Sequence, residues 1–223
     1  FPELVNLEEN TLILEYVRGN IIEKILKVDL MDKFPAVNED VLTRLITIIY
    51  ERPGVYLNYD NLAGDLKISK KTLLQHMYYL EFAYLVRKVK NYRPTTHTTS
   101  RKMQRAYPYH FTLRFGWTGI IDAETVVATC ADAQYYWREK DKEVDFLVGK
   151  KNLVPVEVKE GSRIGAEQLS SLFYFMKTFG KKEGLLVYSG EEGMIEKDGF
   201  RIIKKPLWQW VIETQGLKQK KQV

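Results

Sequence analysis

Residues 143–159 decide the fold of the carboxyl half, and they read Glu-Val-Asp-Phe-Leu-Val-Gly-Lys-Lys-Asn-Leu-Val-Pro-Val-Glu-Val-Lys. Two runs rich in apolar residues, Glu143 to Val148 and Leu153 to Lys159, predict strands. The Gly-Lys-Lys-Asn stretch between them predicts a hairpin turn. Side chains two residues apart on a strand share a face, so we expect Glu157 and Lys159 to point the same way.

The first of these strands carries Asp145 between two apolar residues. A simple hairpin places Asp145 across from Val156 or Glu157, which brings two carboxylates close together. Two close carboxylates repel each other, and a divalent cation between them relieves the repulsion. Ligation by oxygen alone suits Mg²⁺ or Mn²⁺, with waters and a substrate phosphate completing the shell.

Lys159 gains a role beside such a metal ion. Its ammonium group can orient or deprotonate an attacking water, or stabilise the charge that develops on a phosphate. The alternative is that Asp145 and Glu157 are polar ends of exposed strand faces, with Lys159 as an ion partner. The acids lie inside otherwise apolar strands, where an isolated charge is costly, and this favours a built site.

The rest of the carboxyl half predicts an α/β sandwich around a small mixed sheet. The expected elements are helices and strands in the order α-β-β-α-β-(β)-α. Outside the hairpin they are a helix from Ile120 to Ala131, an amphipathic helix from Ala166 to Phe179, strands at Gly184–Tyr188 and Phe200–Ile203, and a helix from Leu207 to Thr214. This domain is expected to span residues 116–216, with a basic tail at 217–223.

The amino half predicts helices followed by two extended runs. The helices are expected at Leu12–Val28, at Val41–Tyr50 after an Asn38 N-cap, at Asn58–Leu66, and from a Ser69 cap to about Phe82. The extended runs are Tyr84–Tyr92 and Tyr107–Arg114, joined by a polar loop. Three short helices and a hairpin with a basic tip are typical of a winged helix, here residues 37–115.

Basic residues gather in this region. The whole chain has a formal net charge of +5, but residues 67–105 hold ten Lys and Arg against one acid, Glu81, which makes them net +9. Such a face suits DNA. The expected DNA contacts are Lys70, Lys71, Gln75 and an exposed His76 on the fourth helix, and Arg93, Arg101, Lys102 and Arg105 on the wing, with Leu73, Leu74, Met77 and Leu80 packed inward. The alternatives are a solvated face without a partner and a protein-interaction module.

The composition limits the classes of protein to which the chain can belong. Apolar residues make up 45% of the chain, enough for a core, and no apolar run is long enough to cross a membrane. The one cysteine, Cys130, fits a reducing cytoplasm and is expected to be a buried hydrophobe. The chain begins Phe-Pro-Glu without Met or a signal peptide, so we expect an excised fragment. A homo-oligomer is compatible with the sequence.

The stretch Tyr135-Tyr-Trp-Arg-Glu-Lys-Asp-Lys-Glu-Val-Asp-Phe-Leu-Val-Gly149, with Leu153-Val-Pro-Val-Glu-Val-Lys159, resembles a family of prokaryotic and archaeal AAA+-type ATPases. In that family an ATPase domain is followed by a winged helix and a domain related to PD-(D/E)XK nucleases, similar to archaeal Holliday-junction resolvases. Phe1-Pro-Glu3 resembles the end of a segment after the ATPase lid, and Leu57-Asn-Tyr-Asp-Asn-Leu-Ala63 resembles a family helix. Residues 1–36 would then be a helical linker after that lid.

The resemblance implies an α+β chain with a restriction-endonuclease-like second domain. It implies that Glu124, Asp145 and Glu157 bind the metal and that Lys159 is the catalytic lysine. Gly119 to Glu124 is one residue longer than the family spacing, and Asp122 competes for the first position. Residues 107–113 lack the family's Asp and Gly at the domain junction. The Walker A loop is absent, so ATP would bind only through an upstream domain.

Three functions compete at this point. The first is a Mg²⁺- or Mn²⁺-dependent DNA endonuclease brought to DNA by the winged helix. The second is a non-catalytic DNA-binding or regulatory module of the upstream ATPase. The third is a protein-interaction platform. An intact acid–lysine constellation permits nuclease activity without establishing it.

Overall fold

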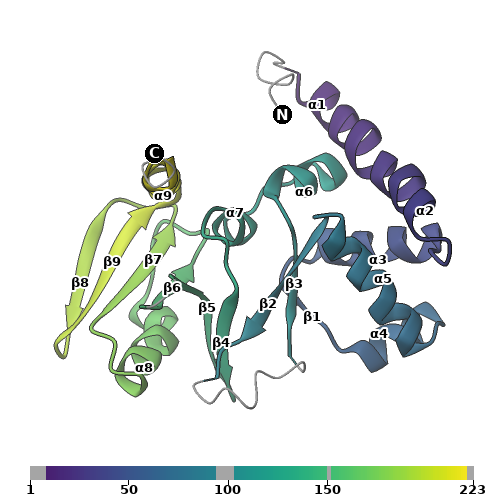
Figure 1. The fold of residues 1–223 in the computed structure, drawn as a ribbon. Helices are drawn as coiled ribbons and strands as arrows, with labels where there is room; N and C mark the ends of the chain where they lie inside the picture. Colours follow the sequence, from purple (N-terminus) through teal and green to yellow (C-terminus); the bar gives the residue numbers. More distant parts are fainter. Residues whose placement is uncertain (1–8, 94–102, 150–151, 220–223) are drawn as a thin grey trace. The chain divides into compact units, whose positions relative to one another are not determined.

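The computed structural model describes residues 9–93, 103–149 and 152–219 and divides the chain into two compact units (Figure 1). The first unit comprises residues 1–88 and 102–121, and the second comprises 89–101 and 122–223. The chain therefore passes from one unit to the other more than once. Each unit is described below by itself.

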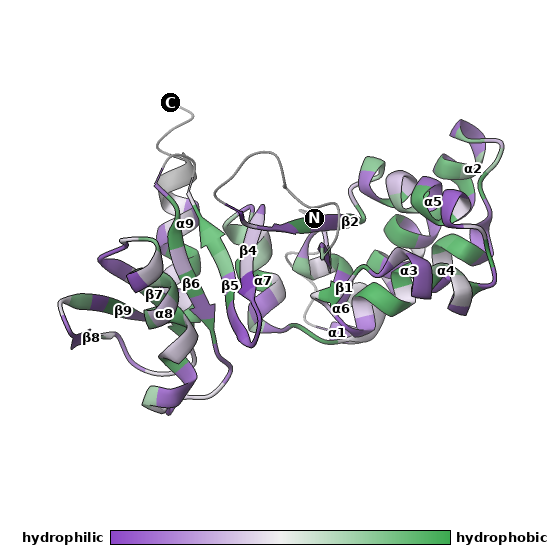
Figure 2. Ribbon diagram, turned by 90° about the horizontal axis from the view of Figure 1, so that it is seen from below, coloured by the Kyte–Doolittle hydropathy of each residue, from purple (hydrophilic) through white to green (hydrophobic). Residues whose placement is uncertain are grey.

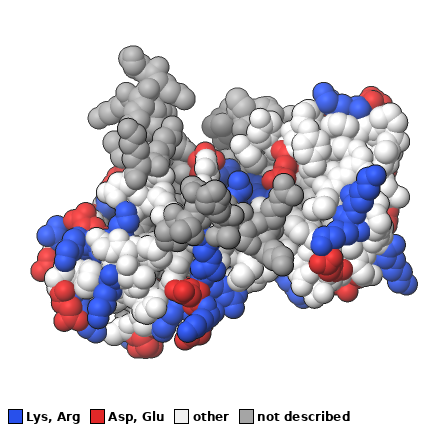
Figure 3. Space-filling model, turned by 60° about the horizontal axis from the view of Figure 1, so that its bottom comes forward, with Lys and Arg blue, Asp and Glu red and all other residues white. Residues whose placement is uncertain are grey.

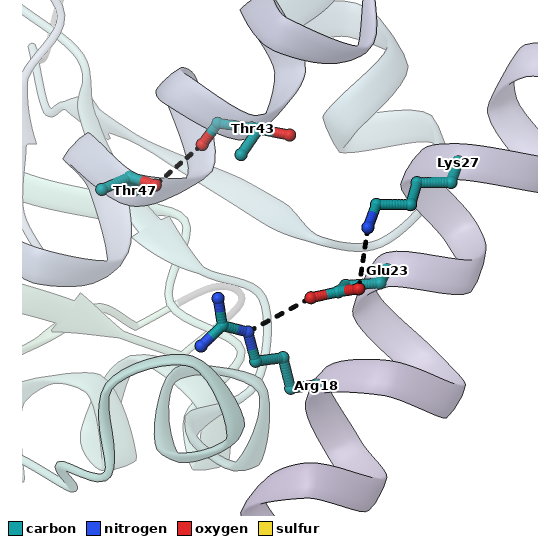
Figure 4. Close-up of polar contacts among 5 residues, drawn as sticks. All are labelled: Arg18, Glu23, Lys27, Thr43 and Thr47. Atoms are coloured by element: carbon teal, nitrogen blue, oxygen red, sulfur yellow. Dashed lines mark hydrogen bonds and ion pairs between the residues drawn. The ribbon is translucent and has the colours of Figure 1, made fainter.

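The first unit opens with a succession of helical turns between residues 10 and 33. Its segments are α1 (Asn10–Tyr16), the π-helical η2 (Val17–Glu23) and η3 (Ile25–Asp29), and α2 (Leu30–Lys33). Glu23 lies at the centre of an ion-pair triad here, accepting from Arg18 Nε at 3.2 Å and from Lys27 Nζ at 2.9 Å (Figure 4). The Glu23–Lys27 pair, four residues apart, supports the exposed side of the helical segment.

Three further helices follow, and their caps explain where they begin. They are α3 (Glu39–Glu51), α4 (Tyr59–Leu66) and α5 (Lys70–Phe82). The side chains of Asn38 and Ser69 accept from backbone N–H groups three residues on, so both predicted N-caps are confirmed. Asn58 caps α4 in the same way and is not itself the first helical residue. Within α3, Thr47 Oγ1 donates to Thr43 O at 2.9 Å (Figure 4).

The second extended run of the first unit is shorter than the sequence predicts. The strand β3 (Arg105–Pro108) pairs with β1 (Val55–Tyr56), but the chain turns helical at α6 (Phe111–Thr118). The prediction of extended structure as far as Arg114 was therefore wrong. His110 caps the new helix, accepting from Thr112 N at 3.2 Å, and burial of Leu113 and Arg114 fixes its inner face.

The sheet is larger than predicted. Within the described residues it has nine strands in the order β1-β3-β2-β4-β5-β6-β7-β9-β8. The remaining strands are β2 (Val86–Asn91), β4 (Tyr135–Glu139), β5 (Lys142–Val148), β6 (Val154–Val158), β7 (Glu183–Tyr188), β8 (Gly193–Lys197) and β9 (Phe200–Pro206). The strands β6, β7 and β9 run parallel, whereas β4, β5 and β6 are antiparallel neighbours. The sheet is mixed, as expected, but not small.

The sequence did not predict β4 and β8. Both are short, and both end in charged residues that obscure an alternating pattern. Each is held by an antiparallel partner close in sequence, β5 for β4 and β9 for β8. These two segments therefore form strands because each pairs with a neighbouring strand, and not because of their own side-chain pattern.

Helices cover the sheet of the second unit. They are α7 (Ala123–Cys130), the 3₁₀ turn η5 (Ala166–Leu169), α8 (Ser170–Thr178) and α9 (Leu207–Gln219). The helix α8 packs against β5, β6 and β7, while α7 packs against β6 and α9 (Figure 1). The hydrophobic core of the second unit includes Trp137, Val144, Leu147, Leu172, Phe175, Met176, Leu186 and Ile202.

Hydrophobic and hydrophilic residues are interspersed along the helices of both units (Figure 2). The apolar residues that α3 and α5 bury lie in one core cluster of the first unit. This is the pattern of helices with one packed face. Among the described residues, we find no helix with the length and apolar character needed to span a bilayer.

Candidate acid and lysine site

The register of β5 against β6 brings the predicted acids together. Phe146 pairs with Val156 and Leu147 with Pro155, so continuing the register by one residue places Asp145 opposite Glu157. The sequence had left Val156 and Glu157 open as the partner of Asp145. The structure selects Glu157.

Asp145 is fixed by the backbone of the neighbouring strand. Its Oδ2 accepts a hydrogen bond from Val158 N at 2.8 Å. On the other side of β6 the pairing with β7 continues, since Lys159 N donates to Val187 O at 2.9 Å. The Asp145 carboxylate thus accepts the hydrogen bond from Val158 N that a backbone carbonyl would accept in a regular strand ladder. This bond holds the Asp145 side chain at the point where the β5–β6 ladder ends.

Glu157 and Lys159 form a close, partly buried ion pair. Lys159 Nζ lies 2.6 Å from Glu157 Oε1, and the side chains are 29% and 7% exposed respectively. The other oxygen, Glu157 Oε2, is buried and makes no hydrogen bond within the described part of the chain. A buried carboxylate oxygen without a partner is costly. Lys159 therefore satisfies only one of the two carboxylate oxygens.

The electrostatics of the pair reflect several nearby acids. Burial raises the pKa of the Glu157 carboxyl above its usual value, more than Lys159 lowers it, and Glu143 and Glu124 raise it further. Burial alone would lower the pKa of the Lys159 ammonium, but Glu157, Asp145 and Glu124 together raise it. The lysine therefore stays charged among carboxylates that compete for the same space.

Glu124 belongs to this electrostatic group. It lies in the first turn of α7 and acts on both Glu157 and Lys159. Asp122, the alternative at this position, is the N-cap of α7, with its Oδ1 accepting from Thr125 N at 2.8 Å. The structure thus gives Asp122 a capping role and leaves Glu124 as the helix acid whose charge acts on the pair.

Glu143 is an acid of the site that the sequence reasoning missed. Besides its effect on Glu157, it pairs across the strands with Arg138 and lies 3.8 Å from the Arg138 guanidinium. The signal was present, because Glu143 precedes Asp145 by two residues on the same predicted strand. Glu143, Glu124 and Lys159 therefore all act electrostatically on Glu157.

The described carboxylates set limits on the metal ion that this site could hold. No group of three or more His, Cys, Asp or Glu side chains is placed to hold a metal anywhere in residues 9–93, 103–149 and 152–219. Mg²⁺ is usually bound through one or two carboxylates and keeps several waters. Asp145 and the unpartnered oxygen of Glu157 fit that smaller requirement. The residues are consistent with a hydrated Mg²⁺ or Mn²⁺ ion and not with an all-protein cage.

The predicted DNA-binding face of α5 differs from expectation in two positions. His76 is buried, with Nε2 accepting from Asn38 N at 2.9 Å and Nδ1 placed to donate to Thr72 O at 2.8 Å. Leu74, expected inside, is 43% exposed. The helix is rotated relative to the predicted packing because His76 ties α5 to the start of α3.

The other predicted DNA contacts lie in varied surroundings. On α5, Lys71 is exposed, Lys70 is paired with Asp60 at 2.8 Å, and Gln75 bonds to the Tyr79 hydroxyl at 2.5 Å.

Of the wing residues, Arg93 is half-buried, while Arg101 and Lys102 lie outside the described residues. Arg105 is buried and donates from Nε to Gly54 O at 2.8 Å, which gives it a structural role. Figure 3 shows Lys and Arg interspersed with Asp and Glu over the described surface on one face.

Together these features define a mixed α and β chain of two compact units, the second of which carries an acid–lysine cluster at the end of a central strand. The family described as a domain of unknown function, DUF8612, matches residues 1–114, just over half of the chain. The chain therefore belongs to the DUF8612 family. No curated protein and no solved structure is significantly similar to it.

A second family covers the acid–lysine cluster. The domain of unknown function DUF4143 matches residues 123–208, which include Glu124, Asp145, Glu157 and Lys159. This domain is typically found in the C-terminal region of AAA-type ATPases. The finding agrees with the expected relationship to ATPase C-terminal regions.

Proposed function

We propose that the chain is the DNA-binding and nuclease-like region of an AAA-type ATPase, and that its acid–lysine cluster supports Mg²⁺- or Mn²⁺-dependent cleavage of phosphodiester bonds. In this proposal the first unit is a winged helix and the second has a PD-(D/E)XK fold. The observation that carries it is the meeting of Asp145, Glu157 and Lys159 at the end of β6, with Glu157 Oε2 buried and unpartnered in the described structure.

Each residue has a distinct task. Asp145 and Glu157 would hold the metal ion, with Glu124 and Glu143 close enough to influence Glu157. The metal would lower the pKa of a bound water and neutralise charge on the phosphate. Lys159 would release Glu157 and turn its ammonium toward the attacking water or the developing phosphate charge. Val158 N keeps Asp145 oriented throughout.

The test is cleavage of branched, single-stranded and supercoiled DNA with Mg²⁺ or Mn²⁺. We expect Asp145→Asn, Glu157→Gln and Lys159→Ala each to lower the rate at least about 100-fold, the loss typical of removing one catalytic charge. Lys205→Ala is the matched control, because Lys205 forms an ion pair with Glu213 outside the cluster. Cleavage that persists unchanged in all three variants rejects the proposal.

A second candidate is a non-catalytic DNA-binding or regulatory module of the ATPase, or a protein-interaction platform. Two observations favour it: Lys159 already pairs with one oxygen of Glu157, and no three-acid metal group is found among the described residues. It predicts DNA binding that weakens steeply with salt, without cleavage under any metal. A platform alone predicts neither binding nor cleavage.

A further inference from the structure

A line of large apolar side chains runs along the exposed face of α5. Leu74, Tyr78 and Phe82 follow each other at intervals of four residues and are 43%, 55% and 44% exposed. Residues at this spacing share one face of a helix. Single exposed apolar residues are ordinary, but a contiguous row marks a binding surface.

Tyr84 follows Phe82 by two residues, past the end of the helix, in an unfavourable backbone conformation. Leu85 N donates to Leu80 O at 3.0 Å and Tyr84 N to Glu81 O at 3.1 Å, the hydrogen bonds of a Schellman motif. Tyr84 occupies the left-handed position of that motif at φ 55°, where Gly is preferred. Its ring is nevertheless 65% exposed, so burial does not offset the strain. A strained, exposed aromatic residue points to a role outside folding.

Cations lie beside the Phe82 ring and beside Tyr109, the ring that Tyr84 contacts. Lys33 Nζ is 4.9 Å from the centre of the Phe82 ring. Tyr84 packs edge-on against Tyr109 at 5.0 Å, and the Arg87 guanidinium lies 4.6 Å from the Tyr109 ring centre.

The acid on α5 does not offset these cations, because Glu81 pairs with Lys88 at 2.5 Å. The surface formed by Leu74, Tyr78, Phe82 and Tyr84, called the aromatic surface below, is thus flanked by positive charge.

We propose that the aromatic surface binds single-stranded nucleic acid, with unpaired bases stacked on Tyr78, Phe82 and Tyr84 and phosphates near Lys33, Lys71 and Arg87. Exposed rings alternating with cations are the usual platform for single strands. A duplex hides the faces of its bases, so stacking selects unpaired nucleotides. The charge favours a polyanion over a protein partner, because Lys33 and Arg87 lie beside the Phe82 and Tyr109 rings, while Glu81, the acid of α5, is paired with Lys88.

This inference takes from the proposed function only that the first unit contacts nucleic acid. The test is binding of the full 223-residue chain to a labelled mixed-sequence DNA strand of about 20 nucleotides, long enough for one such platform, and to its duplex. EDTA is present throughout, so metal-dependent cleavage does not contribute. Failure of the nuclease test therefore leaves this measurement unaffected.

We expect the single strand to bind more tightly than the duplex. Tyr78→Ala and Tyr84→Gly should each weaken single-strand binding about 5- to 100-fold, the loss expected for one stacked base. Because Gly relieves the strained position, Tyr84→Gly should also raise the melting temperature by about 2–4 °C, which separates lost binding from misfolding. Trp208→Ala is the matched control, since Trp208 is 66% exposed on α9 in the other unit.

Three outcomes overturn the proposal. The first is duplex binding at least as tight as single-strand binding. The second is single-strand affinity that is unchanged in both Tyr78→Ala and Tyr84→Gly. The third is no nucleic-acid binding even at about 50 mM salt, where phosphate contacts are strong, which would assign the aromatic surface to a protein partner.

Discussion

Glu157 carries a buried charge that is only partly compensated by its neighbours. It lies between two buried valines on a central strand, and only one of its oxygens is compensated by Lys159. Replacing both members of a buried ion pair such as Glu157 and Lys159 with apolar side chains is often neutral or stabilising. A residue whose burial is this costly is better explained by the chemistry it supports than by stability.

His110 should make the stability of the first unit depend on pH. Burial, helped by nearby Arg87, lowers the pKa of His110 below its usual 6.5. The unfolded chain therefore binds a proton more readily than the folded chain, so the free energy of unfolding should fall as pH drops below about 6.5. Protonation would also remove the acceptor that caps α6 at Thr112 N.

Chemical denaturation between about pH 5 and 8 measures this effect. His110→Asn keeps a capping side chain without a titrating group, and we expect it to flatten the dependence over that range. An equally steep dependence in His110→Asn would show that another group is responsible.

At the scale of elements, α6 and η2 approach more closely than ordinary side chains allow. A Cβ atom added to Gly116 would lie 2.3 Å from Val17 Cγ1. Gly116 therefore sets the distance between these two segments. By contrast, Gly64 in α4 has no heavy atom within 4 Å of the position of an added Cβ.

These two glycines predict opposite responses to the same substitution. Gly116→Ala should destabilise the protein by about 1–3 kcal/mol through overpacking, and Val17→Ala should restore part of that loss. Gly64→Ala should stabilise it by about 0.5–1 kcal/mol, because Ala favours a helix interior. Thermal or urea unfolding measures both. Equal effects of the two substitutions would contradict the packing argument.

At the scale of the whole molecule, β2 belongs to both compact units. Its residues as far as Lys88 lie in the first unit, and those from Val89 lie in the second. There Lys90 and Asn91 pair in parallel with Tyr135 and Tyr136 of β4. The Asn91 side chain adds two bonds to the Arg138 backbone, at 3.0 and 3.2 Å.

A fragment of residues 122–223 should consequently be unstable. It lacks Val89–Asn91, so β4 becomes an open edge with unpaired backbone groups. We expect it to melt more than about 5 °C below fragment 89–223 and to self-associate, since several hydrogen bonds are lost. Melting followed by circular dichroism and size-exclusion chromatography are the measurements. A monomeric fragment 122–223 with the melting temperature of 89–223 would contradict this.

The sequence by itself determined the local features. Asn38 and Ser69 begin their helices as predicted, because a cap is a contact between residues three apart. The strands around Asp145 and Glu157 follow from alternation and a short turn, and so does the shared face of Glu157 and Lys159. The relationship to ATPase C-terminal regions also followed from short motifs in this region.

Only the tertiary structure decided the features that depend on distant partners. His76 is buried because Asn38 donates to it, and Arg105 because it bonds to Gly54 O. The strands β4 and β8 form by pairing with their neighbours. The helix α6 replaces a predicted strand because its inner face, with Leu113 and Arg114, is buried within the first unit. The place of Glu143 beside Glu157 likewise depends on how β5 meets β6. The contacts of His76 and Arg105 join residues far apart in the chain, and the strand pairings depend on register with a neighbouring strand, so a local pattern encodes neither.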